Sequence, residues 1–172
     1  MESDLNLPPL VAEIANGSVT WHRIEGLDYQ AIGYFLSCHL IIEQYLDEYL
    51  KLLYAELDWD AARLTFNHKV SLLSRFKVGE KYDCISAIKH LNSLRNKLSH
   101  NIEFKIEASD LLPLTQYLTK AYEGNKSRVP KEPKDILSHF TSLACVLFAG
   151  LISGYAQVKA NPKVLKSSHP EG

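Results

Sequence analysis

Apolar residues recur at steps of three and four along most of the chain, which is the spacing of one face of an α-helix. The pattern predicts a long helix from Asp28 to about Tyr54, with Asp28 as its N-cap. The other predicted helices cover 66–76, 82–100, 111–122 and 136–158. The sequence therefore predicts an all-α protein, an up-and-down bundle of about five helices.

The chain divides into three parts by this pattern. Residues 1–26 are broken by Pro8-Pro9 and Asn16-Gly17, so we expect an irregular N-terminal extension there. Residues 27–158 form the helical bundle, and 159–172 form a flexible tail.

The segment 136–158 contains no Asp, Glu, Lys or Arg. Its strongly apolar core, 143–152, is only about ten residues long, which is typical of a buried helix rather than a membrane span. We therefore expect a central or dimer-interface helix and no membrane contact.

The composition bears on the cellular compartment and on the charge that a partner would meet. The three cysteines are far apart, with no Cys-x-x-Cys pair, and the N-terminus has no apolar run typical of a signal peptide. These features favour a cytoplasmic protein without disulfides, without a metal site and without a cofactor. The net charge of −1 favours no class of partner, but 81–105 carries five basic side chains against two acidic ones. The basic ones are Lys81, Lys89, Arg95, Lys97 and Lys105.

Polar and basic residues cluster at the end of the predicted helix 82–100, in the run Arg95-Asn96-Lys97-Leu98-Ser99-His100. Asn96 and His100 are four apart and share a face while the helix lasts. Arg95 and His100 are five apart, so a regular helix turns them roughly 140° away from each other. They can act on one atom only if the helix ends near His100 or if a second copy of the chain supplies one of them.

This run resembles the signature of the HEPN superfamily, in which Arg and a polar residue, often Asn, are followed by His after a gap of four to six. The resemblance implies a helical bundle in which two protomers join their motifs into one composite, metal-independent ribonuclease site. It implies Arg95, Asn96 and His100 as catalytic residues.

The same resemblance implies supporting roles for other side chains. Lys97 and Ser99 are candidates to touch the RNA backbone. A polar residue on the first long helix, here Glu43, often faces the motif in that family, where it can orient Arg95 or hold a histidine tautomer. RNA and a second copy are the implied partners, and a toxin or defence role is implied. An antitoxin protein is a further possible partner, although Ile102 stands where some HEPN toxins carry a tyrosine that their antitoxin modifies.

Two other interpretations stay open. One takes Arg95 and His100 as a solvated helix end, because a cationic last turn suits the helix dipole. The other is a non-catalytic helical binding or regulatory module, resembling the mannitol-operon repressor family.

Overall fold

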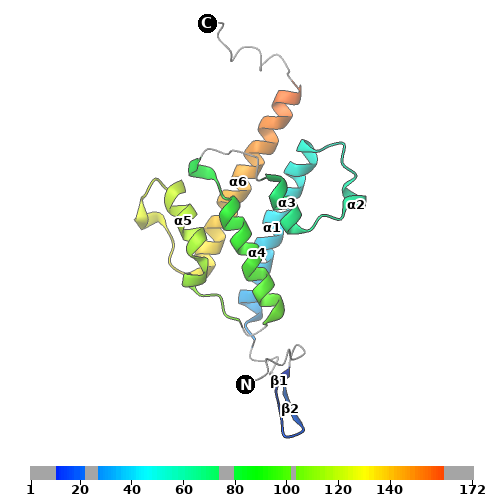
Figure 1. Ribbon diagram of the computed structural model, residues 1–172. Helices are drawn as coiled ribbons and strands as arrows, with labels where there is room; N and C mark the ends of the chain where they lie inside the picture. Colours follow the sequence, from blue (N-terminus) through cyan, green and yellow to red (C-terminus); the bar gives the residue numbers. More distant parts are fainter. Residues whose placement is uncertain (1–10, 22–26, 74–79, 102–103, 161–172) are drawn as a thin grey trace.

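The computed structural model describes residues 11–21, 27–73, 80–101 and 104–160. The all-α prediction is confirmed, since six α-helices make up the bundle and the only sheet in these ranges is a two-stranded hairpin (Figure 1). The helices are α1 (Tyr29–Leu53), α2 (Trp59–Ala62), α3 (Phe66–Leu72), α4 (Ile85–His100), α5 (Leu112–Ala121) and α6 (Pro133–Ala160). Within the described ranges, the connections include the 3-10 turns Glu80–Tyr82, Ala108–Leu111 and Lys126–Arg128.

Short polar side chains set the helix starts. The Asp28 carboxylate accepts the N–H of Ala31 at 2.9 Å, which fixes the first turn of α1 as expected. The single turn α2 lies where the sequence indicated only a connection, and it forms because Asp58 caps it through the Ala61 N–H.

The helix that carries the motif begins later than expected. Residues 80–82 form a 3-10 turn, and α4 starts at Ile85, where Asp83 accepts the backbone N–H. It still ends at His100, as predicted.

The core lies between α1, α4, α5 and α6. Helix α1 packs along α6 more extensively than along any other helix. The largest fully buried side chains are Phe35, Ile42, Leu46, Leu50, Ile88, Leu91, Leu94, Leu111, Leu114, Leu118, Ile136 and Phe140. Burial of each such side chain contributes about 1.5–3 kcal/mol to folding, so this one cluster holds the bundle together.

The N-terminal extension is not irregular throughout. Strands β1 (Val11–Ala15) and β2 (Ser18–Trp21) pair in antiparallel fashion, with Ile14 opposite Val19. Asn16 and Gly17 make the turn, both with positive φ, which is the geometry that an Asn-Gly hairpin turn requires. The residue alternation here was too short to predict the pairing.

Helix α6 is long and apolar enough to cross a membrane by length and composition, and 33% of its most apolar window is buried. Its first half supplies Ile136, Phe140 and Ala144 to the core. That packing agrees with the expected central helix for this half. The second half continues past the ends of the other helices (Figure 1).

Candidate functional site

The last turns of helix α4 have a buried apolar face and an exposed polar side that carries the motif residues. Leu94 and Leu98 are buried, whereas the polar residues between and after them are exposed: Arg95, Asn96, Lys97, Ser99 and His100. Because the helix is regular through His100, Arg95 and His100 stay roughly 140° apart around its axis. One chain therefore does not bring these two side chains onto one atom.

Asn96 lies between them. Arg95 Nη1 donates to Asn96 Oδ1 at 3.4 Å, a long and weak hydrogen bond, and Asn96 is one turn from His100 on the same side of the helix. Ser99 donates its hydroxyl to the Asn96 carbonyl at 2.8 Å, and the Lys97 ammonium lies 5.6 Å from the centre of the Phe104 ring. Of the three predicted catalytic residues, Arg95 and Asn96 are thus in contact with each other, and His100 lies one turn further along, as the last residue of α4.

A buried polar chain that the sequence analysis did not assign to the site lies behind this face. His39 of α1 is 3% exposed, and its Nε2 lies 3.2 Å from Asn92 Oδ1. Asn92 in turn donates its amide to Asn67 Oδ1 at 2.9 Å. Since Asn92 Oδ1 is an acceptor, the His39 Nε2 nitrogen carries the proton and donates it. The chain leads from the interior to Asn67, which is exposed, and it joins α1, α4 and α3.

Burial lowers the pKa of His39 below its usual value. The hydrogen bond with Asn92 and the negative charge of Glu43 act against this change, and the positive charge of Arg95 acts with it. The ring of Phe66, 4.5 Å away between centroids, forms part of the apolar surround. Burial, the largest of these effects, therefore favours the neutral form of His39.

Glu43 does not pair with Arg95, the side chain that it could orient if the family resemblance holds. Its carboxylate lies 2.8 Å from Lys69 Nζ and 3.9 Å from His39 Nδ1, so it pairs with a lysine of α3 rather than with Arg95. Lys69 also contacts Asp47 at 2.8 Å. Burial alone lowers the pKa of Lys69, but its hydrogen bonds and charge pairing with both carboxylates outweigh burial and raise it. The histidine that Glu43 faces is His39, not His100.

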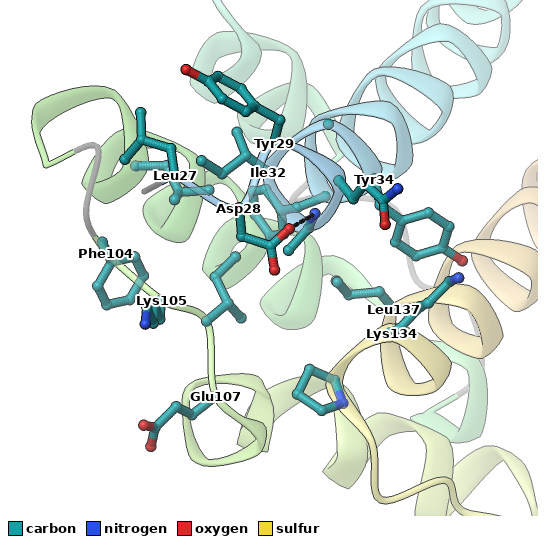
Figure 2. A pocket seen from close by; sticks show the side chains of 17 residues that line it. Leu27, Asp28, Tyr29, Ile32, Tyr34, Phe104, Lys105, Glu107, Lys134 and Leu137 are labelled. Atoms are coloured by element: carbon teal, nitrogen blue, oxygen red, sulfur yellow. Dashed lines mark hydrogen bonds between the residues drawn. The ribbon is translucent and has the colours of Figure 1, made fainter. Parts of the chain in front are cut away.

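A hollow of about 1380 Å³ opens at the end of the bundle, beside the last turn of α4 (Figure 2). The hollow is lined by Leu98 of α4, by the start of α1, by residues 104–107 and by the start of α6. Its charged lining residues balance, with Asp28 and Glu107 against Lys105 and Lys134, so it favours neither anions nor cations. The Lys134 ammonium is already held 5.4 Å from the centre of the Tyr34 ring.

Across the described residues, no group of three or more His, Cys, Asp and Glu side chains is arranged to hold a metal ion. Cys38 and Cys84 are buried free thiols, as expected of small apolar residues, and Cys145 is half-buried. Comparison with protein-family profiles, with curated proteins and with solved structures finds no match.

Proposed function

We propose that the protein is a metal-independent endoribonuclease of HEPN type that works as a homodimer in the cytoplasm. The observation that carries the proposal is the exposed group Arg95, Asn96 and His100 at the end of a helix in an all-helical bundle, with Asn96 touching Arg95. The local excess of basic residues along 81–105 favours an RNA partner, because phosphates attract cationic side chains, although Lys81 is already paired with Glu123.

The chemistry follows from RNA itself, which carries a nucleophile beside each phosphodiester. A base removes the proton from the 2′-hydroxyl, and the 2′-oxygen forms a bond to phosphorus. The bond from phosphorus to the 5′-oxygen breaks, and an acid protonates the leaving oxygen. The products are a 2′,3′-cyclic phosphate and a 5′-hydroxyl, and no metal is required.

His100 is the residue of the motif whose type suits both proton transfers near neutral pH. Arg95 presents a fixed fork of donors that stabilises the charge on the phosphoryl oxygens in the transition state. Asn96 accepts a long hydrogen bond from the Arg95 guanidinium and lies one turn before His100, so its amide is a candidate to orient His100 or to donate to the phosphate. Two copies supply two histidines, one as base and one as acid.

The divergence of Arg95 and His100 within one chain supports a composite site, because a second copy is then needed to complete the set. It is also the observation that favours the second candidate, a non-catalytic binding or regulatory module in which these side chains only contact RNA or solvent. A toxin role with an antitoxin partner belongs to the first candidate.

The test is cleavage of a mixed RNA pool in EDTA by the parent protein, Arg95→Ala and His100→Ala. Cleavage by the parent alone, with cyclic-phosphate ends, is expected. Equal cleavage by parent and variants removes these residues from the mechanism, and no cleavage by a folded parent favours the binding module.

Co-expression of the parent with His100→Ala in equal amounts tests the composite site. If each site needs both histidines, only pure parent dimers cleave, and random pairing gives about one quarter of the parent's activity; if each site needs a single histidine, activity is about one half.

A further inference from the structure

The chain of hydrogen bonds that begins at the buried His39 ends on the surface at Asn67. Asn92, in the middle, is 6% exposed, and its Nδ2 group donates to Asn67 Oδ1 at 2.9 Å. Its other amide atom, Oδ1, lies 3.2 Å from His39 Nε2 and accepts a hydrogen bond from it. Because both ends of the Asn92 amide are held, the buried side fixes which atom of Asn67 turns inward. That atom is the Asn67 oxygen, so the Asn67 Nδ2 group is turned away from this contact.

The Asn67 Nδ2 group is an unused hydrogen-bond donor. Asn67 is exposed, and among the described residues no acceptor bonds its Nδ2 group. The cation on the same short helix is in a different position, because Glu43 and Asp47 of α1 both hold the Lys69 ammonium at 2.8 Å. Of these two polar side chains of α3, Asn67 is therefore the one that is free to donate to a ligand outside the chain.

Asn67 lies on the side of α4 that carries Arg95 and Asn96. Asn92 precedes Arg95 by three residues and Asn96 by four, so these two side chains leave the helix about 60° to one side of Asn92 and about 40° to the other. Both are within about 6 Å of Asn92 along the helix axis. Asn67 contacts Asn92 and is therefore on the same side of α4 as both. The positive charge of Arg95 also acts to lower the pKa of His39, as expected if Arg95 is near this hydrogen-bonded chain.

We propose that Asn67 is a further RNA-contacting residue, whose Nδ2 group donates a hydrogen bond to a phosphate oxygen next to the phosphate that Arg95 binds. The assignment rests on the proposed function, because that function places a phosphodiester at Arg95. Within the described residues no carboxylate pairs with Arg95, so its charge is available to the RNA. His39 and Asn92 are then positioning residues, since they act on the RNA only by fixing the direction of the Asn67 amide.

A phosphate oxygen is the acceptor that suits this amide. Asparagine reads an adenine base with its oxygen and its nitrogen together, as a bidentate pair. The Asn67 oxygen is turned inward and bonded to Asn92, so only the donor half of the amide faces outward. A lone amide donor is typical of contacts to phosphate, which hold the nucleic acid in place without reading its sequence. The contact is therefore expected to be independent of the base.

The test compares Asn67→Asp with Asn67→Ala. In Asn67→Asp one carboxylate oxygen still accepts the Asn92 N–H, and the outward donor becomes a charged oxygen; Asn67→Ala removes both ends of the amide. The measurement is the dissociation constant for a short fluorescein-labelled 2′-O-methyl RNA of mixed sequence, by fluorescence anisotropy in EDTA. The methyl group blocks the oxygen that cleavage needs, so the probe stays intact. The dissociation constant is expected to rise at least ~10-fold in Asn67→Asp, and by a smaller factor in Asn67→Ala.

Asn125→Asp is the matched control for charge. Asn125 is exposed, and its side chain caps the 3-10 turn Lys126–Arg128 by accepting the Ser127 N–H, a role that aspartate also fills. The substitution therefore adds the same negative charge away from α3 and α4. Its dissociation constant is expected to stay within ~3-fold of the parent's, because salt screens a charge that does not touch the RNA.

The order of the variants separates a contact with RNA from a structural role. If Asn67 only holds Asn92 in place, Asn67→Ala binds worst and Asn67→Asp binds like the parent, which overturns the assignment. Equal weakening by Asn67→Asp and Asn125→Asp also overturns it, since charge alone then explains the effect. Thermal unfolding of each variant shows that it is folded. A lower Tm for Asn67→Asp than for Asn67→Ala would mean that the amide turns its oxygen outward, and would refute the donor role.

The binding readout does not depend on cleavage, so the two proposals fail separately. Weakened binding by Asn67→Asp, in a protein that does not cleave unmodified RNA, retains the contact and refutes the nuclease. Metal-independent cleavage by the parent, together with parent-like binding by Asn67→Asp, refutes only the contact. A parent that neither binds the probe nor cleaves RNA refutes both.

Discussion

Replacement of Asn92 by alanine tests the buried polar chain most directly. Asn92 is 6% exposed and holds two hydrogen bonds, one from His39 and one to Asn67. The substitution leaves the buried Nε2–H of His39 without an acceptor, and a buried unsatisfied polar group costs about 1–3 kcal/mol. Asn67 is exposed and recovers its hydrogen bond from water, so it adds little.

The expected loss in free energy of unfolding is therefore about 1–3 kcal/mol, measured by urea denaturation. For a chain of 172 residues this corresponds to a fall in Tm of about 2–12 °C, taking about 2–4 °C for each kcal/mol.

Asn96→Ala is a matched control, because it is the same substitution one turn further along α4. Asn96 is exposed and its contact with Arg95 is long, so its change in stability is expected to lie within about 0.5 kcal/mol. Equal effects of the two substitutions would refute the claim that the His39–Asn92–Asn67 chain stabilises the fold.

Three further outcomes follow from the same region. Lys69→Met leaves two half-buried carboxylates without their cation, so it is expected to lower the free energy of unfolding by about 1–3 kcal/mol in urea denaturation. The control Lys51→Met removes a lysine from a pair whose side chains are 50% and 60% exposed, and it is expected to cost under about 1 kcal/mol. Similar costs for the two variants would contradict the role given to Lys69. The pKa of His39 is lowered from 6.5 in the folded protein, so as the pH falls the unfolded chain binds a proton at this histidine before the folded protein does. The free energy of unfolding therefore falls as the pH drops below about 6.5 toward the folded pKa, and His39→Gln is expected to flatten this dependence. An unchanged pH profile in the variant would mean that another group causes the dependence. Arg95→Lys keeps the charge but loses the fork of donors, so RNA binding is expected to persist while the cleavage rate falls at least ~10-fold; a parent-like rate would mean that only charge matters at this position.

The helical bundle could be predicted from the sequence because the periodicity of apolar residues is a strong signal over long helices. The start of α1 at its Asp28 cap and the end of α4 at His100 followed from local chemistry alone. The hairpin at 11–21 and the single turn α2 were missed, since four or five residues hold too few repeats to reveal a period.

The candidate residues Arg95 to His100 were found from residue types, whereas the buried hydrogen bonds of His39 and Asn92 were not. His39 and Asn92 each occupy a position on an apolar face, where a polar side chain is buried only if it has a partner. That signal is visible in the sequence, but their pairing joins residues on two helices, and helix spacing contains no information on which polar positions meet. For the same reason Glu43 was expected near Arg95, and Lys69, 26 residues away, was not considered.

The pairing of α1 with α6 has a consequence for how the chain is made. About 80 residues separate the end of α1 from the start of α6. At roughly 5–20 residues per second, a ribosome needs about 4–16 s to synthesise that interval. Helices α3 and α4 emerge within it and pack on α1, but the part of the apolar face of α1 that α6 covers stays open during this time. Folding of the bundle is therefore largely completed after α6 emerges, and nascent chains truncated before Pro133 are expected to be substrates for chaperones and proteases.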